Sequence, residues 1–311
     1  MIFHRTILAL LIAIMLCSPA DSSAAAGLVE PHTSQQFRSY WYPNGAEISR
    51  FALRQARYGE LYDGDAVLIF VTESMNPKLQ VKADHPRPGD IPILKLNSVR
   101  KFFTGIYPYS TLTSTFAPVD DQAYPFPLKI TATTQEWCGN VYLQMNLREN
   151  QWRVESRSYF EKEADQTFQL PAAMPEDALW TTIRIDPASL PQGEFSLIPG
   201  AVYTRFLHRP VQPSKVFGQL SADDGKSLEG KPLVCYTVIF RDEGRTLKIL
   251  FERDFPYRIQ RWEDTHRVLS GGTLTTTAVR THTILNDYWN HHSNRDRRLL
   301  MQLGLKDGTQ Q

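Results

Sequence analysis

The stretch KITATTQEWCGNVYLQMNLR, from Lys129 to Arg148, decides the fold class. Apolar and polar residues alternate along both of its halves, on either side of a Gly-Asn pair. A period of two is typical of a half-buried antiparallel strand, because successive side chains point to opposite faces of the sheet. With Leu128 in front, one apolar series is Leu128, Ile130 and Ala132, and the other is Val141, Leu143, Met145 and Leu147.

Turn residues separate further segments of this kind. Gly139-Asn140 suits a two-residue hairpin turn between the two halves of the opening stretch. Asp63-Gly64 precedes the apolar run AVLIF, and Asp242-Glu243-Gly244 separates LVCYTVIF from TLKILF, in which Leu247, Ile249 and Phe251 alternate with polar residues. Successive hairpins predict a meandering antiparallel sheet.

Helix signals are few. Pro175-Glu176-Asp177 before ALWTTIR places proline and acids in the first turn of a short helix. The tail SNRDRRLLMQLG offers Asn294 as an N-cap and Gly304 as a stop. The sequence therefore predicts a mainly β protein, built as a large curved antiparallel sheet or half-barrel with one or two short helices.

The N-terminus is typical of an export signal. His4 and Arg5 precede an apolar run of about ten residues, roughly half of a membrane-spanning helix, and small residues follow in SSAAAG. We expect residues 1–26 to be a signal peptide and the protein to be periplasmic, with no transmembrane segment. Cys17 closes the apolar run after Leu16, so a lipid anchor through Cys17 is the alternative.

The rest of the chain divides weakly. Residues 27–39 are polar and without periodicity, so we expect a flexible leader. Residues 40–220 are expected to form an antiparallel β region. After a composition break in SADDGKSLEG, residues 221–311 are expected to form a C-terminal β region with a terminal helix, continuous with the preceding sheet.

Several long motifs carry a resemblance. YWYPNGAEISRFALRQARYGE, AVLIFVTE, KFFTGIYPYSTLTSTF, TQEWCG, SYFEKEADQTF, LWTTIRIDPASLPQG and YWNHHSNRD together resemble an exported bacterial protein family of unknown function, commonly labelled "septum formation inhibitor Maf". True Maf nucleotide pyrophosphatases are cytoplasmic α/β proteins with an N-terminal Ser-x-Ser-Pro-Arg-Arg loop. In this sequence the only Ser-Pro pair is Ser18-Pro19, which lies inside the expected signal peptide, so the motif of that enzyme is missing and pyrophosphatase activity is disfavoured. The resemblance itself implies an exported protein.

A second similarity concerns fold alone. VCYTVIF, a turn and TLKILFERDFPYRIQRWED look like the last strands of exported β proteins that curl around a helix or an apolar ligand. The carriers that move lipoproteins across the periplasm share that half-barrel architecture. Fold does not establish function.

Two cysteines remain after export, Cys138 and Cys235. In an oxidising compartment a disulfide between them is favoured over two free thiols. Cys138 is also a weak candidate for a catalytic nucleophile, with Glu136 on the same strand face. A neighbouring carboxylate raises the pKa of a thiol and so opposes that role.

Basic and aromatic residues gather in RKFFTGIYPY. A strand rim of this kind suits a lipid head group or a glycan, through stacking and charge-assisted contacts, although a place in the core is the more ordinary role for such rings. We take as candidate ligand-binding residues Arg100, Lys101, Phe103, Tyr107, Tyr109 and Trp137, with Phe102 beside them.

Two function classes follow from these features. The first is a non-enzymatic cell-envelope binding or carrier protein for an apolar or amphipathic ligand. The second is an envelope hydrolase that uses Cys138 or the acids Glu161, Glu163 and Asp165, since paired carboxyls serve glycoside chemistry. A net charge of +1 gives no general attraction for nucleic acid, and we expect no cofactor and no metal, because the late histidines are not spaced to converge.

Overall fold

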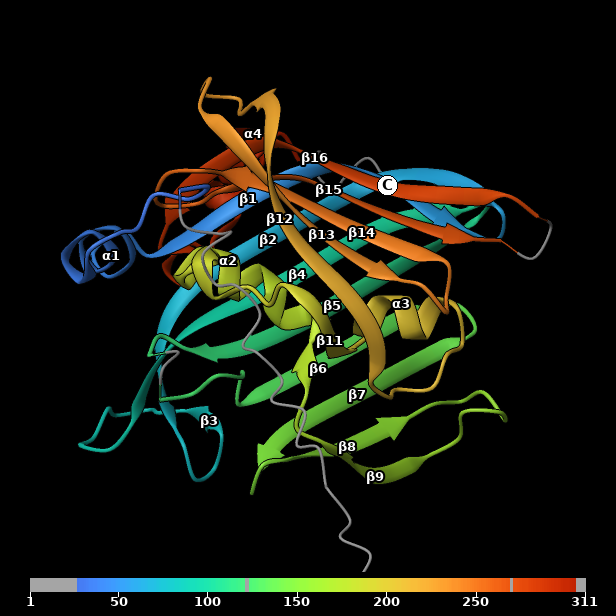
Figure 1. The fold of residues 1–311 in the computed structure, drawn as a ribbon. Coiled ribbons are helices and arrows are strands. Elements are labelled where there is room, and N and C mark those ends of the chain that lie inside the picture. The colour runs from blue at the N-terminus through green and yellow to red at the C-terminus, as the bar shows by residue number, and fades with distance from the viewer. Residues whose placement is uncertain (1–26, 121–122, 269–270, 306–311) are drawn as a thin grey trace, which may run out of the picture.

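A single sheet of sixteen strands dominates the computed structural model, which describes residues 27–120, 123–268 and 271–305. Figure 1 shows the sheet curving around two short helices. The prediction of a large curved antiparallel sheet is confirmed, while the expected signal peptide and Cys17 lie outside the described residues. No helix in the described ranges combines the length and apolarity that a membrane crossing requires.

The strand order is β10-β11-β12-β13-β14-β15-β16-β1-β2-β4-β5-β6-β7-β8-β9, with β3 paired to β2. All pairs on this path are antiparallel except β10 with β11. The first half contains β1 (Ala46–Arg57), β2 (Glu60–Asn76), β3 (Val81–Lys82), β4 (Ile91–Thr104), β5 (Tyr107–Pro118), β6 (Lys129–Glu136), β7 (Gly139–Arg148), β8 (Gln151–Arg157) and β9 (Gln166–Pro171).

The second half contains β10 (Met174–Pro175), β11 (Gly193–Ile198), β12 (Ser214–Lys226), β13 (Pro232–Phe240), β14 (Arg245–Glu252), β15 (Ile259–Arg267) and β16 (Thr273–Asn286). Strand β16 pairs with β1, so the first and the last strand meet in the middle of the sheet. The composition break at residues 221–230 falls within β12 and the turn after it, and the sheet is continuous through it.

The α-helices among the described residues are short: α1 (Ser34–Trp41), α2 (Leu179–Ile185), α3 (Ala201–Phe206) and α4 (Arg298–Gln302). The predicted helix at residues 175–185 is present as the 3-10 turn η2 (Glu176–Ala178) followed by α2. The tail helix is also present, as the 3-10 turn η5 (Asn294–Arg297) followed by α4, but the cap of η5 is Ser293, which forms a capping box with Asp296, rather than Asn294. Helix α1 begins inside the expected leader and buries Phe37 and Trp41.

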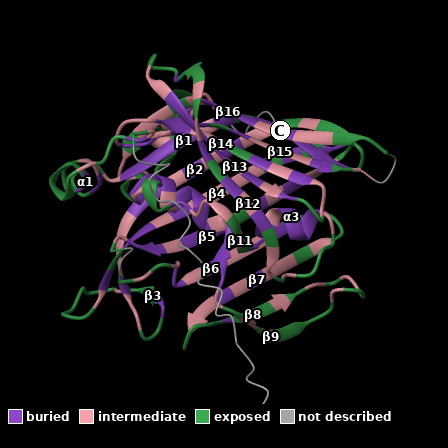
Figure 2. Cartoon of the chain, viewed as in Figure 1, coloured by how far each residue is buried: buried purple, intermediate pink, exposed green. Residues whose placement is uncertain are grey.

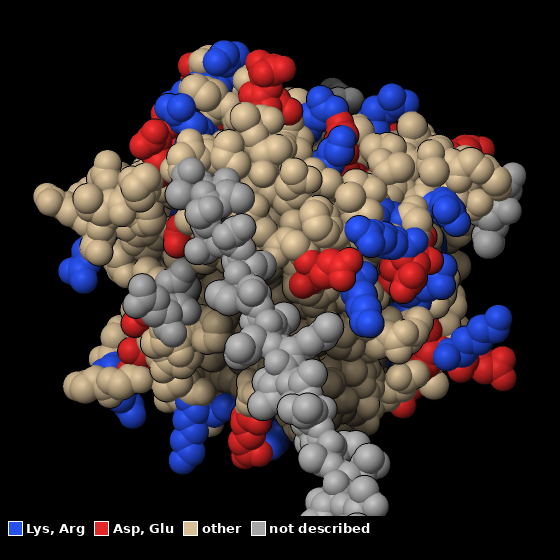
Figure 3. All heavy atoms as spheres, in the orientation of Figure 1, with Lys and Arg blue, Asp and Glu red and all other residues tan. Residues whose placement is uncertain are grey.

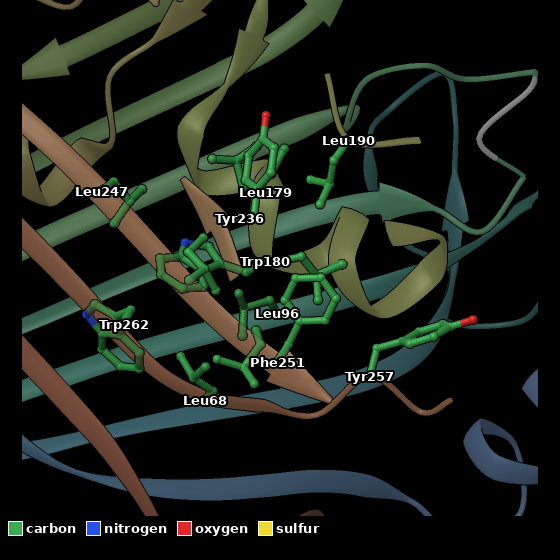
Figure 4. Packing of buried hydrophobic residues seen from close by; sticks show 14 of the residues in the cluster. Leu68, Leu96, Leu179, Trp180, Leu190, Tyr236, Leu247, Phe251, Tyr257 and Trp262 are labelled. Carbon is green, nitrogen blue, oxygen red and sulfur yellow. The ribbon is translucent and has the colours of Figure 1, made fainter. Parts of the chain in front are cut away.

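The core lies between the concave face of the sheet and α2. Trp262, Phe251 and Leu68 of the sheet are almost fully buried, and Leu179 and Ile183 of α2 join the same cluster (Figure 4). Along the strands, buried positions alternate with more exposed ones (Figure 2), as the period of two in the sequence predicts. The inward series of each strand and the apolar face of α2 therefore build one core.

Two of the predicted hairpin turns lie elsewhere. The β1–β2 turn is Tyr58-Gly59, and Gly64 lies inside β2 opposite Leu53. A Cβ on Gly64 would be 2.2 Å from the carbonyl oxygen of Lys101, so glycine is required there for close strand approach. The β6–β7 turn is Trp137-Cys138, because Gly139 already pairs with Glu136. The turn at Asp242-Glu243-Gly244 is confirmed.

Candidate ligand-binding site

A cavity of about 710 Å³ opens between α3 and the sheet. Its walls are the end of β1 with the β1–β2 turn, the end of β15, the start of β16, and α3 with the residues that follow it. Its apolar lining includes Ala56, Val202, Phe206, Leu207, Val268 and Leu274. Figure 3 shows basic and acidic side chains gathered in the region of α3.

Helix α3 is held in place by two consecutive acids. Glu176 Oε2 accepts a hydrogen bond from the backbone N–H of Gly200 at 3.0 Å, and Asp177 Oδ2 accepts one from Ala201 at 2.9 Å. These N–H groups have no partner within the helix, so the acids take the place of a local cap. The turn before α2 thereby fixes the helix that forms one wall of the cavity.

Arg245 connects this cap to the sheet. Its guanidinium, 1% exposed, forms two bonds with Glu176, at 2.5 and 2.7 Å, and two with Asp264, at 2.7 and 2.9 Å. Burial acts to lower the pKa of Arg245, but the carboxylates of Asp264 and Glu176 outweigh it and the pKa is raised. Arg245 is therefore fully occupied by structural contacts.

Asp177 lies beside Arg245 and Glu176, but no ion pair with a basic side chain stabilises its charged form in the described part of the chain. Burial, followed by the charge of Glu176, raises the pKa of Asp177 to about 7, against the N–H of Ala201 and the charges of Arg100 and Arg245. Its side chain nevertheless keeps some accessible surface. Asp177 therefore titrates near neutral pH at the base of α3.

Arg57 enters the cavity from the end of β1. The guanidinium donates to the carbonyl of Phe206 and, at 3.1 and 3.4 Å, to the hydroxyls of Tyr58 and Tyr109. Arg57 is 8% exposed, and its Nε has no hydrogen-bond acceptor. It has no carboxylate partner in the described part of the chain, which is unusual for a buried charge.

Arg100 enters from β4. Its Nη1 donates to Gln55 Oε1 at 3.2 Å, and its guanidinium carbon lies 5.6 Å from the ring centre of Trp262. Its Nε is buried without an acceptor, although the residue as a whole is only half-buried, because part of the side chain faces the cavity. Burial lowers the pKa of Arg100, against the charges of Asp264 and Asp177.

His266 completes the polar lining. Its side chain is buried, its Nδ1 has no hydrogen-bond partner, and burial lowers its pKa, so the ring is neutral at physiological pH. The lining residues thus combine apolar side chains with arginine and histidine side chains that are incompletely hydrogen-bonded, an arrangement typical of a small-molecule site.

The candidate residues at 100–109 divide between the two faces of the sheet. Arg100 lines the cavity, and Tyr109 is in the core, stacked on Phe102 at 5.1 Å between ring centres. Lys101 and Phe103 are exposed and alternate with these inward residues. Tyr107, at the start of β5, packs against the exposed Trp137 of the β6–β7 turn, with ring centres 6.1 Å apart. Strand alternation therefore separates residues that are neighbours in the sequence.

The predicted disulfide is wrong. Cys138 is an exposed free thiol in the β6–β7 turn, whereas Cys235 is a buried free thiol in β13, between β12 and β14. Strands β6 and β13 are far apart in the strand order, which keeps the two residues on different parts of the sheet. Glu136, by its hydrogen bond and its charge, raises the pKa of the Cys138 thiol, and its Oε2 accepts the Cys138 N–H at 2.7 Å.

Two of the acids in residues 161–165, Glu161 and Glu163, border a second cavity of about 550 Å³ on the other side of α3, and Asp165 does not line it. Glu163 accepts hydrogen bonds from Ser158 at 2.6 Å and His208 Nδ1 at 2.5 Å, and it pairs with Arg205 at 3.4 Å. Burial acts to raise the pKa of Glu163, but the bonds from Ser158 and His208 outweigh it and lower the pKa. Glu161 and Asp165 are exposed, so neither of them is held beside Glu163 as the second carboxyl of a catalytic pair.

Sequence reasoning missed Arg57, Arg245 and Asp264. A signal was present for Arg57 and Arg245, because each continues an inward apolar series of its strand, whereas Asp264 follows only Trp262 in its phase. Arg57 follows Phe51 and Leu53 in phase, and Arg245 precedes Leu247 and Ile249. A charge in the buried phase of a strand marks either a buried ion pair or a site.

Comparisons with known proteins add little. No protein-family model and no curated protein matches the chain. A solved structure, Aeromonas veronii immune modulator A, matches over 77% of this chain and 94% of its own, with 7% identity and a TM-score of 0.15. A likeness this weak carries no argument about fold or function.

Proposed function

We propose that this protein is a non-enzymatic binding or carrier protein of the cell envelope, and that its ligand is an apolar or amphipathic small molecule. The supporting observation is the cavity between α3 and the sheet. Its volume of about 710 Å³ lies within the range of roughly 300–1,000 Å³ usual for ligand pockets, and it pairs apolar walls with a few unpartnered polar groups. The export signal expected at residues 1–26 supports an envelope location.

The hydrolase alternative has weaker support. The hydrogen bond and charge of Glu136 raise the pKa of the Cys138 thiol, which leaves less of the reactive thiolate. Glu163 is engaged by Ser158, His208 and Arg205, and its neighbours Glu161 and Asp165 are solvent-exposed. Neither arrangement offers an activated nucleophile or two carboxyls poised across a bond.

A cavity-filling substitution tests the proposal. Val202 lines the cavity from α3, and Val211 lines the second cavity, so Val202→Trp and Val211→Trp form a matched pair. We expect the neutral apolar probe N-phenyl-1-naphthylamine to fluoresce on binding the wild type and Val211→Trp, and to bind Val202→Trp at least tenfold more weakly. Equal binding by both variants, or no binding by the folded wild type, would contradict the proposal.

A further inference from the structure

The charges that line the cavity between α3 and the sheet are unbalanced. Four arginines line it, Arg57, Arg100, Arg209 and Arg267, and Asp264 is the one acid among its lining residues. Asp264 is already engaged by two bonds from Arg245. None of the four arginines has an ion pair within the described part of the chain, so the cavity has an excess of positive charge.

Two of these arginines, Arg57 and Arg100, have a buried N–H group without a hydrogen-bond acceptor, which is Nε in each. A buried donor that is left unpaired destabilises the folded protein, and it does so more strongly when the group is charged. These Nε atoms are themselves closed off from the cavity, but Nη2 of Arg100 makes no hydrogen bond and keeps accessible surface. A carboxylate or phosphate in the cavity would find a free charged donor there.

A purely structural role explains part of Arg57 but not Arg100. Arg57 donates to the carbonyl of Phe206, the last residue of α3, and so holds the helix end against the sheet. Arg100 makes one hydrogen bond, to the neutral amide of Gln55, and it reaches the acids at the start of α3 only through its charge, which acts on Asp177 without an ion pair among the described residues. Arg100 is therefore the side chain whose position a bound anion best explains.

The apolar half of the cavity lies beside these groups. Val202, Phe206 and Leu274 line the same space as Arg57 and Arg100. The guanidinium carbon of Arg57 lies 5.1 Å from the ring centre of Phe206, so charged and apolar lining are in direct contact. A ligand that fills this cavity meets both kinds of surface at once.

We propose that the ligand of this cavity is an amphipathic anion, whose carboxylate or phosphate is held by Arg100 and Arg57 and whose apolar part lies against Val202, Phe206 and Leu274. This inference rests on the proposed function and narrows it to a ligand class. Arg209 and Arg267, which are exposed, draw the anion toward the opening.

A set of ligands with one chain and different head groups tests the inference. Dodecanoate, dodecyl phosphate, dodecanol and dodecyltrimethylammonium are titrated, below their micelle concentrations, into the full chain by isothermal titration calorimetry. We expect at least one of the two anions to bind tenfold or more tightly than dodecanol, and the cation to bind least. The stronger of the two anions distinguishes a carboxylate from a phosphate ligand.

The variants Arg100→Gln and Arg54→Gln identify the residue responsible. Arg54 is a matched control on the outer side of β1, with a side chain 62% exposed and outside the cavity. We expect Arg100→Gln to weaken anion binding about tenfold or more while leaving dodecanol binding unchanged, and Arg54→Gln to change neither. Thermal unfolding of each variant verifies that it is folded, and Arg100→Lys replaces Arg100→Gln if the latter does not fold.

The outcomes separate the two proposals. Equal affinity of the wild type for dodecanoate, dodecyl phosphate and dodecanol would overturn the anion inference and leave the binding function in place. Loss of anion binding to the same extent in Arg54→Gln and the Arg100 variant would also overturn it. Failure of the wild type to bind any of these ligands or the neutral naphthylamine probe would overturn the binding function itself.

Discussion

Asp177 offers a quantitative test of the charge network at the base of α3. Its carboxyl has an ordinary pKa of 3.8 in an unfolded chain and a pKa of about 7 in the folded protein, raised by burial and by Glu176. The folded state therefore holds a proton more tightly than the unfolded state does. Its contribution to stability is complete below pH 4 and is lost as the pH rises toward 7.

The magnitude follows from the two pKa values. At about 1.36 kcal/mol for each pH unit, a pKa change from 3.8 to about 7 corresponds to at most about 4 kcal/mol. Because Asp177 keeps some accessible surface, we take this figure as an upper limit. Between about pH 5 and pH 6.5, the free energy of unfolding should fall by up to about 1.4 kcal/mol for each pH unit on account of this one group.

Asp177→Asn removes the titration and keeps an oxygen that can accept the N–H of Ala201. Urea unfolding of both proteins, followed by tryptophan fluorescence from pH 4 to 8, measures the difference in their free energies of unfolding. Other titrating groups are common to both and largely cancel. We expect the variant to gain stability relative to the wild type as pH rises, levelling above pH 7, and a difference that does not vary with pH would refute the reasoning.

Three further predictions concern single residues. Glu136→Gln should speed alkylation of Cys138 by iodoacetamide at pH 7.5, because Glu136 raises the pKa of that thiol, and an unchanged rate measured by mass spectrometry would contradict this. Gly64→Ala should lower the free energy of unfolding by about 1–3 kcal/mol or more, since the new Cβ would meet the Lys101 carbonyl and Phe102, and an unshifted urea midpoint would count against it. Trp262→Ala should cost about 3–5 kcal/mol, because Trp262 is 1% exposed at the centre of the core, whereas a loss below 1 kcal/mol would show that the ring does not pack there.

The strands were predictable from sequence because their evidence is local. Alternation in residues 129–148 and 245–252 predicts strands that the structure contains. The turns were less predictable, since Asp63-Gly64 has the composition of a turn yet serves close packing inside β2, and the real turn uses Tyr58 at positive φ. Composition alone does not distinguish a glycine needed for φ from one needed for space.

The candidate site was mostly beyond local patterns. Arg100 was selected from the sequence because aromatic residues follow it, and it does line the cavity. Its position there depends instead on contacts with Gln55 and Trp262, which are distant in the sequence. Helix α3 carries no strong start signal in its own sequence, because its cap is supplied by Glu176 and Asp177, 24 residues earlier. Partners that meet only through the fold leave no signal at short range.

Native mass spectrometry of the protein, purified without detergent from the cells that make it, tests the central claim most directly. The account predicts one bound anionic amphiphile per chain, released by denaturation, identified after solvent extraction, and missing from Val202→Trp purified in the same way. The claim that this cavity binds a ligand would be contradicted if the native mass of the wild type equals that of the polypeptide alone in repeated preparations and the protein binds no added amphiphile.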